Sequence, residues 1–116
     1  MITLYGIRNC DTVKKARAWL DDQGVAYAFH DYKSAGITRT RLEQWCQWVG
    51  WEKLLNRSGT TFRKLPEGDR TALDRKRAVA LMLEHPSAIK RPVLERAGSI
   101  LVGFDPQVYA AELGRR

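Results

Sequence analysis

The sequence of 116 residues contains little cysteine, with Cys10 and Cys46 as its only two. Two thiols are too few for a disulfide framework, so we expect both to be free in a reducing compartment. Structural zinc sites contain pairs of Cys or His residues that lie a few positions apart in the sequence. The two cysteines, His30 and His85 form no such pair, so we predict no metal site. Each cysteine is therefore expected to be either a packing residue or a reactive thiol.

The sequence also lacks long apolar runs, internal repeats and low-complexity segments. Because no run of about 18 apolar residues is present, we predict no membrane span. The first segment, MITLYGIRNC, has no basic start followed by a long apolar core, so we expect no secretion signal and a cytoplasmic protein. No linker divides the chain, which predicts a single domain over residues 1–116.

The composition is that of a packed protein with excess positive charge. Hydrophobic residues make up 44% of the chain, and the formal net charge is +7. Basic residues gather in FRKLPEGDRTALDRKRA and in the final GRR, and such residues attract nucleic acid without regard to its sequence. Acidic residues interrupt the segment and no recognition motif accompanies it. We therefore favour a solvated helix face over a nucleic-acid site, with an anionic small molecule as the next use of the charge.

The first third of the chain has the pattern of a β-α-β unit. A short apolar run predicts a strand at residues 2–5, and residues 25–32 are rich in strand-forming side chains. Between them, a helix over Thr12–Gln23 is indicated by apolar residues at helical spacing, with Gly24 as its stop signal. These residues are Val13, Ala16, Trp19 and Leu20. The two strands should be parallel.

The middle of the chain predicts a helical insert over roughly residues 38–86. Thr38 can cap a helix whose apolar stripe contains Leu42, Trp45, Cys46 and Val49. On such a face Cys46 is expected to be a small packing residue. A helix-breaking stretch at 56–69 then precedes a helix at about Arg70–Glu84, expected to bury some of Leu73, Val79, Ala80, Met82 and Leu83.

The last third predicts a β-hairpin and a final helix. Two short apolar runs flank Ala97-Gly98, and Asp105 can cap a helix with Pro106 at its first position. The complete order is β-α-β, helical insert, β-β-α. This order predicts an α/β protein with a thioredoxin-like fold.

Cys10 lies at, or just before, the predicted start of the first helix. Unpaired backbone N–H groups and the helix dipole favour a thiolate there, and cysteines in such settings have a pKa of about 3.5 to 7.5 rather than 8.5. The same N–H groups can hold an anion beside the sulfur. The alternative is a buried, inert cysteine, which fits poorly because its neighbours are polar. These neighbours are Arg8, Asn9, Asp11 and Thr12, with Lys14 one turn on.

The segment IKRPV is a second candidate part of the site. A proline that opens a strand is a place for a cis peptide bond, here Arg91-Pro92. Arg91 would then lie near the sulfur and could pair with a carboxylate or an oxyanion through two hydrogen bonds. The alternative is an edge-strand proline beside a solvated arginine.

Four segments together resemble the ArsC-like family: YGIRNCDTVKKA, FHDYKSAGI, GTTFRKL and HPSAIKRPVL. This family includes glutaredoxin-coupled arsenate reductases, the Spx regulators and the YffB-type proteins. The resemblance covers roughly residues 1–108 and is strongest to the YffB-type branch. It implies a thioredoxin-like fold of the ArsC type and a cis proline at Pro92.

The resemblance also assigns roles to residues. The catalytic cysteine of the family corresponds to Cys10, and the arginine of its RP motif to Arg91. An earlier active-site arginine falls at Asn56 in strict alignment, which leaves Arg57 and Arg63 as candidates. The third arginine of the arsenate reductases has no counterpart, because Gly103 stands at the nearest position. The second cysteine of the Spx redox switch is Val13 here, which excludes a local disulfide switch.

From these residues we expect a glutathione-dependent thiol reductase with Cys10 as its nucleophile. We expect no bound cofactor, glutathione as co-substrate and glutaredoxin as a further candidate partner. The alternatives are an arsenate reductase and an Spx-like protein that contacts RNA polymerase without turnover; neither a membrane nor a nucleic acid is an expected partner. The candidate residues for binding substrate or glutathione are Asn9, Asp11, Thr12, Lys14, Arg57, Arg63, Arg91 and Pro92.

Overall fold

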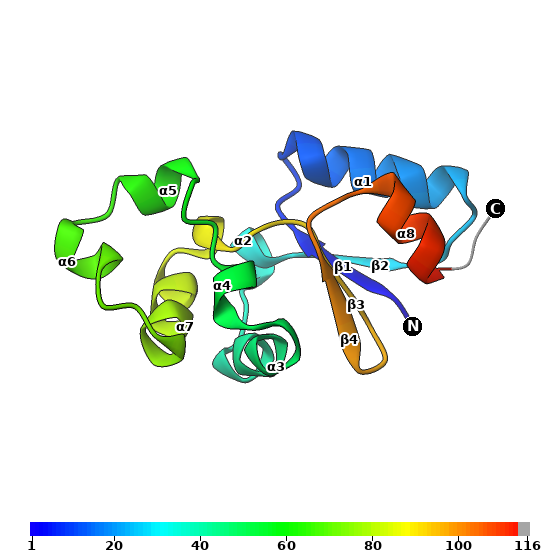
Figure 1. Cartoon of the computed structure of the whole chain (residues 1–116). Helices are drawn as coiled ribbons and strands as arrows, with labels where there is room; N and C mark the ends of the chain where they lie inside the picture. Colours follow the sequence, from blue (N-terminus) through cyan, green and yellow to red (C-terminus); the bar gives the residue numbers. More distant parts are fainter. Residues whose placement is uncertain (114–116) are drawn as a thin grey trace. The chain divides into compact units, whose positions relative to one another are not determined.

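A four-stranded mixed sheet lies at the centre of the first of two structural units (Figure 1). The computed structural model describes residues 1–113, so the basic GRR end lies outside the described residues. The first unit contains Met1–Tyr32 and the chain from Arg91 onward, and the second contains Lys33–Lys90. The predicted helical insert falls within the second unit. The assignment of the chain to a single domain stays a prediction.

The sheet has the strand order β2-β1-β3-β4. Strand β1 (Thr3–Gly6) pairs in parallel with β2 (Ala28–Asp31), as the β-α-β pattern predicts. On its other side β1 pairs antiparallel with β3 (Val93–Arg96), which forms the predicted hairpin with β4 (Ser99–Val102). Strand β2 is shorter than the predicted 25–32. The predicted thioredoxin-like order is confirmed.

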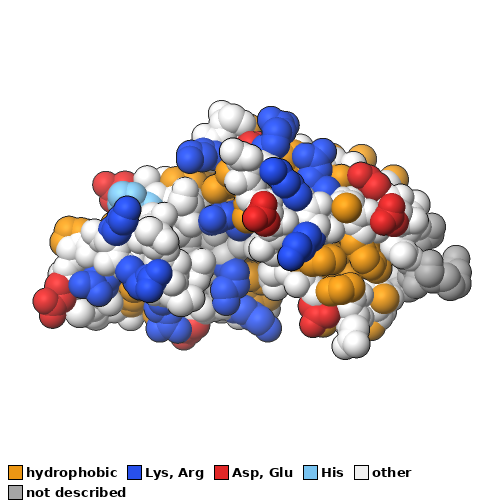
Figure 2. Space-filling view, turned by 90° about the horizontal axis from the view of Figure 1, so that it is seen from above, with side chains coloured by type: hydrophobic (Ala, Val, Ile, Leu, Met, Phe, Trp, Pro, Cys, Tyr) orange, Lys and Arg blue, Asp and Glu red, His pale blue; other side chains and the backbone are white. Residues whose placement is uncertain are grey.

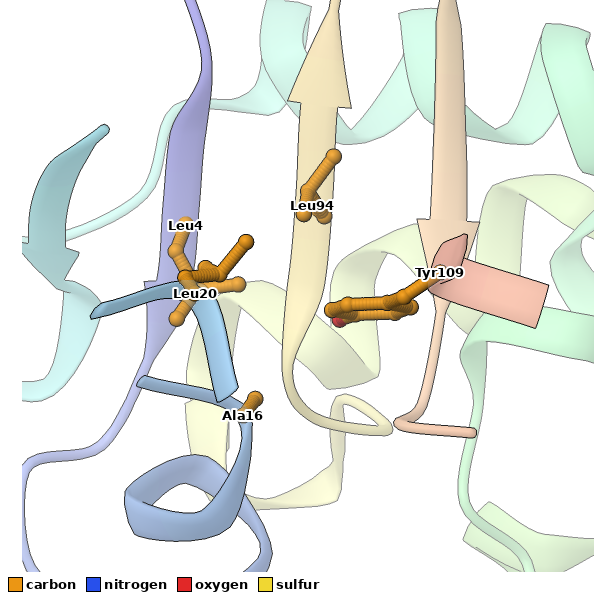
Figure 3. Packing of buried hydrophobic residues seen from close by; sticks show 5 residues of the cluster. All are labelled: Leu4, Ala16, Leu20, Leu94 and Tyr109. Atoms are coloured by element: carbon orange, nitrogen blue, oxygen red, sulfur yellow. The ribbon is translucent and has the colours of Figure 1, made fainter. Parts of the chain in front are cut away.

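Two helices cover one face of this sheet (Figure 1). Helix α1 (Asp11–Asp22) ends at the cap Gln23, one residue before Gly24, and helix α8 (Pro106–Leu113) starts with Asp105 accepting a hydrogen bond from the N–H of Gln107. Figure 3 shows the buried cluster that joins β1, α1, β3 and α8. Its members are Leu4, Ala16, Leu20, Leu94 and Tyr109. Burial of these side chains fixes α1, and with it the end of α1 that carries Cys10.

The second unit is helical and contains more short helices than the sequence pattern predicts. Helix α7 begins at Arg75 rather than at Arg70, because Asp74 caps it by accepting a hydrogen bond from the N–H of Arg77. The stretch 56–69, expected to break helices, contains single-turn helices. The elements are α2 (Tyr32–Ala35, whose first residue belongs to the first unit), α3 (Arg39–Val49), α4 (Trp51–Leu54), α5 (Thr60–Arg63), α6 (Glu67–Arg70), α7 (Arg75–Glu84) and the 3₁₀ turn η1 (Pro86–Ala88).

Helices α3 and α7 contribute most of the buried side chains of this unit. Thr38 caps α3 as predicted, and the predicted packing role of Cys46 fits its 5% exposure. On α7 the prediction that some of its candidate residues are buried is confirmed by Val79 and Met82, whereas Ala80 is exposed. The buried residues of α7 are Ala78, Val79, Leu81 and Met82.

The surface carries many charged side chains. On the face shown in Figure 2, Lys and Arg side chains lie in several groups with Asp and Glu side chains between them. Within residues 1–113, no helix has the length and apolar character needed to cross a bilayer. The same part of the chain has no group of three or more His, Cys, Asp or Glu side chains arranged to hold a metal ion.

Candidate active site

Cys10 is the N-cap residue of α1, at the position that the sequence predicts. Its backbone is extended, with φ −127° and ψ 127°, and its carbonyl accepts the first helical hydrogen bond from Lys14 at 2.9 Å. The thiol is free and partly buried. The sulfur therefore lies where the first N–H groups of α1 have no helical partner.

The turn between β1 and α1 is tight. A Cβ atom at Gly6 would lie 2.8 Å from Cγ2 of Val13, so only glycine lets the first turn of α1 approach the strand this closely. The backbone N–H of Arg8 donates to Oδ2 of Asp31 at 3.2 Å, which ties the turn to the end of β2. These contacts place Cys10 at the edge of the sheet where the parallel strands β1 and β2 both end.

The sheet register brings Arg91 to the same edge. Tyr5 in β1 pairs with Val93 in β3, so the end of β1 lies beside the start of β3. The Arg91-Pro92 peptide bond is cis, as predicted. The guanidinium group of Arg91 hydrogen-bonds the Cys10 thiol across this edge.

These surroundings act on the pKa of Cys10 in both directions. Partial burial is the largest single influence and raises the pKa of the thiol. The backbone N–H of Val13 and the hydrogen bond from Arg91 lower the pKa, and the N–H of Thr12 and the positive charge of Arg91 lower it further. The net result is a pKa below the ordinary cysteine value, which increases the fraction of thiolate near neutral pH.

Tyr32 is a further member of this cluster and is not among the residues predicted from the sequence. The side chain is 1% exposed and forms a hydrogen bond with Arg91. Burial raises the pKa of Tyr32, so the phenol stays protonated at neutral pH. One signal could have revealed it: Tyr32 follows β2 directly, and the carboxyl ends of adjacent parallel strands meet at one edge of a sheet.

Cys46 has the opposite properties. Burial raises its pKa, Arg75 lowers it, and Glu43 and Glu52 raise it, with a net increase. A buried thiol with a raised pKa is a poor nucleophile. The pKa values of the two cysteines are thus shifted in opposite directions.

The other predicted residues near the thiol occupy distinct positions. Asn9 is exposed in the turn, and the exposed Asp11, Thr12 and Lys14 belong to the first turn of α1. Pro92 is buried, and its carbonyl accepts a hydrogen bond from the N–H of Gly103 at 2.8 Å. The roles of these residues in binding stay predictions.

Arg57 and Arg63 belong to the second unit, where both side chains are exposed. The guanidinium carbon of Arg57 lies 5.5 Å from the centre of the Trp51 ring, and Arg63 is the last residue of α5. At Asn56, the strictly aligned position, the side-chain oxygen Oδ1 accepts a hydrogen bond from the hydroxyl of Ser58 at 3.1 Å. The contribution of these residues to the site stays a prediction.

Gly103 lies at the position nearest to the third arginine of the arsenate reductases. Its φ of +84° falls in the left-handed region, where a side chain costs about 1–2 kcal/mol. Its N–H donates to Pro92, and its carbonyl accepts from the hydroxyl of Tyr109 at 3.1 Å. The backbone at this position therefore suits glycine rather than arginine.

The geometry equips Cys10 for thiolate chemistry. Helix N–H groups and a guanidinium stabilise the negative sulfur, and the same donors can stabilise an anionic group next to it. Cys10 is only partly buried and its neighbours in the turn are exposed. Such an arrangement supports nucleophilic attack on a disulfide or on another electrophile.

The family model of the ArsC family matches residues 5–111. The chain belongs to the ArsC family. This finding confirms the resemblance inferred from the four sequence segments, and it covers both the segment around Cys10 and the segment around Arg91.

Solved structures and a named relative agree with this assignment. The protein is 58% identical to a solved YffB protein, with a TM-score of 0.93 and coverage of 96% of this chain and 97% of the other. It is 55% identical to an arsenate reductase (ArsC) related protein from Brucella melitensis, with a TM-score of 0.78 and coverage of 97% and 93%. It is 29% identical to the global transcriptional regulator Spx of Streptococcus agalactiae, over 99% of this chain and 85% of the regulator.

Proposed function

We propose that this ArsC-family protein is a glutathione-dependent thiol reductase with Cys10 as its nucleophile. The observation that carries the proposal is the placement of Cys10 at the N-cap of α1 beside Arg91, which lowers the pKa of the thiol. Both residues belong to one structural unit, so the arrangement rests on the sheet and α1 alone.

The reaction would proceed by two thiol–disulfide exchanges. In the first, the Cys10 thiolate attacks one sulfur of a substrate mixed disulfide with glutathione. The S–S bond breaks, a Cys10–glutathione disulfide forms, and the substrate leaves as a thiolate that takes up a proton. In the second, a glutathione thiolate attacks this mixed disulfide, which regenerates the Cys10 thiolate and releases oxidised glutathione. In the net reaction one glutathione thiol is consumed, the substrate is released as a thiol with the proton of that glutathione, and its glutathionyl group leaves in oxidised glutathione.

An external thiol is required because the protein offers no resolving cysteine near the nucleophile. Val13 stands where a CxxC motif would place one, and Cys46 is buried with a raised pKa. Glutathione suits the site because it is anionic, while Arg91 and the N–H groups of α1 provide positive potential. Arg57, Arg63 and Lys14 are further candidates to bind its carboxylates.

The test is intact-mass analysis after exposure to oxidised glutathione across a pH series. Wild type, Cys10→Ser and the matched control Cys46→Ser are compared. We expect one glutathione adduct, absent only from Cys10→Ser, that forms well below about pH 8. Slow modification that rises only near pH 8.5, as for an ordinary thiol, would contradict the proposal. Adduct formation on Cys46 instead of Cys10 would contradict it as well.

Arsenate reduction is a second candidate, favoured by the similarity to the ArsC-related protein from Brucella melitensis. An oxyanion of arsenic needs several converging donors, and Gly103 replaces one of the three arginines that the resemblance would require. Arsenate-dependent oxidation of glutathione, with and without glutaredoxin, tests it directly. The expected result is no oxidation above the level of Cys10→Ser.

A binding function without turnover is a third candidate, favoured by the similarity to Spx over 99% of the chain. Such a protein would contact RNA polymerase, and the contact would not depend on the thiol. Pull-down of purified RNA polymerase with wild type and Cys10→Ser tests it. Equal retention by both proteins, together with an unreactive Cys10, would favour binding over the reductase function.

A further inference from the structure

Tyr32 is a buried residue whose hydroxyl group has no role in the proposed reaction. It lies directly after β2, at the edge where β1 ends, and it is 1% exposed. A side chain so buried does not reach a substrate. Its hydrogen bond goes to Arg91, the residue that also hydrogen-bonds the Cys10 thiol. Tyr32 thus contacts Arg91, the residue that hydrogen-bonds the thiol, from the protein interior.

The direction of this hydrogen bond follows from the chemistry of the two groups. A guanidinium only donates, so the hydroxyl oxygen of Tyr32 accepts from Arg91. Tyr32 stays protonated because burial raises its pKa, and the nearby Cys10 and Asp31 charges act in the same direction, opposed by Arg91. A neutral acceptor holds the guanidinium without neutralising its charge. The positive charge therefore stays available to the sulfur.

We propose that Tyr32 is a positioning residue that orients the guanidinium of Arg91 toward Sγ of Cys10. This inference rests on the proposed function, because it concerns how the nucleophile is activated. An arginine side chain has several rotatable bonds, and one fixed acceptor behind it reduces the number of orientations it adopts. Removal of the Tyr32 hydroxyl should therefore weaken the hydrogen bond that stabilises the thiolate.

The test measures the rate of Cys10 alkylation by iodoacetamide as a function of pH, with the modified peptide followed by mass. In Tyr32→Phe we expect the rate at about pH 6.5 to fall roughly threefold, as part of a charge-assisted hydrogen bond is lost, with the rate at high pH unchanged. Arg91→Ala should show a larger decrease. The double variant should equal Arg91→Ala, because Tyr32 acts only through Arg91.

Tyr109→Phe is the matched control. Tyr109 is also 1% exposed and lies in the same unit, and its hydroxyl donates a hydrogen bond to the carbonyl of Gly103. It should lose stability without a change in the alkylation profile. A wild-type profile in Tyr32→Phe would overturn the proposal. Additive effects in the double variant would overturn it too, because Tyr32 would then act on the sulfur directly.

A measurement on the wild-type protein covers the case in which Tyr32→Phe does not fold. The ¹⁵N order parameter of the Arg91 Nε–H group should approach about 0.85, the value of rigid backbone, whereas a value below about 0.6 overturns the proposal. The readouts also separate this inference from the proposed function. If Cys10 forms no glutathione adduct while its alkylation still depends on Tyr32 and Arg91, only the reductase function fails.

Discussion

At the residue scale, the two cysteines of the protein have pKa values that are shifted in opposite directions. Cys10 has helix N–H groups and a guanidinium around its sulfur, and its pKa is lowered although burial acts against this. Cys46 is buried on α3, and its pKa is raised chiefly by that burial. The type of residue therefore does not determine reactivity; the donors that surround the sulfur do.

The lowered pKa of Cys10 predicts a pH-dependent contribution to stability. A group with a lower pKa in the folded state stabilises the protein fully above its unfolded-state pKa, near 9.0, and loses this contribution as the pH falls through the folded-state pKa. Relative to Cys10→Ser, the wild-type Tm should therefore increase as the pH rises toward about 9.0. Thermal unfolding of both proteins under reducing conditions checks this. A Tm difference that is flat, or that shrinks as the pH rises, would contradict it.

The sequence reveals Cys10 but not Tyr32, for a physical reason. A polar turn between a strand and an amphipathic helix is a local pattern, so the exposed position of Cys10 at a helix end follows from its neighbours alone. The bond between Tyr32 and Arg91 depends on the pairing of β1 with both β2 and β3. The β-α-β pattern predicts the pairing of β1 with β2, but the pairing of β1 with β3 joins segments far apart in the chain, which no local pattern encodes.

At the element scale, the length of a helix determines whether the sequence pattern can predict it. Helix α1 begins within one residue of its predicted start. The prediction is this close because three buried residues repeat at helical spacing over a helix of 12 residues. The four-residue helices α4, α5 and α6 span about one turn each, too short for any periodicity to appear. Such turns depend on tertiary contacts rather than on intrinsic propensity.

Helix α7 offers a direct test of capping. Asp74 accepts a hydrogen bond of 2.8 Å from the N–H of Arg77 and sets the start of the helix at Arg75. Asp74→Ala should lower the free energy of unfolding by about 1 kcal/mol, since one N–H loses its partner. Urea denaturation followed by circular dichroism measures this.

Glu84→Ala, at the other end of α7, is the control for this prediction. Glu84 is exposed, and its ion pair with His85, at 3.7 Å, is at the surface and weak. This substitution should change the free energy of unfolding by no more than about 0.5 kcal/mol. Equal effects of the two substitutions would mean that the cap does not determine where α7 begins.

At the scale of the whole molecule, we expect the net charge to determine which disulfides react fastest with Cys10. The formal charge is +7, and Arg91 adds a positive group directly at the thiol. Anionic reagents should therefore reach Cys10 faster than cationic ones of similar size. The selection should weaken with salt, because the screening length falls from about 30 Å at 0.01 M to about 3 Å at 1 M.

Exchange rates of Cys10 with three disulfides check this prediction. Oxidised glutathione is anionic, cystamine is cationic and hydroxyethyl disulfide is neutral. Between about 0.01 M and 1 M salt, the rate with oxidised glutathione should fall, the rate with cystamine should rise, and the rate with the neutral disulfide should stay nearly constant. A parallel change of all three rates would show that salt acts on the thiol and not on the approach of the reagent.

The pairing of β1 with β3 has a consequence for the newly made chain. Arg91 emerges from the ribosome long after Cys10, and the two meet only when strands separated by the whole segment Lys33–Lys90 have paired. Pairings between such distant segments form late, because a long loop must close first. Until then Cys10 lacks the guanidinium that hydrogen-bonds its thiol and lowers its pKa. The complete set of donors around the Cys10 sulfur therefore forms only when β1 and β3 pair, and the nascent chain carries Cys10 without Arg91 beside it.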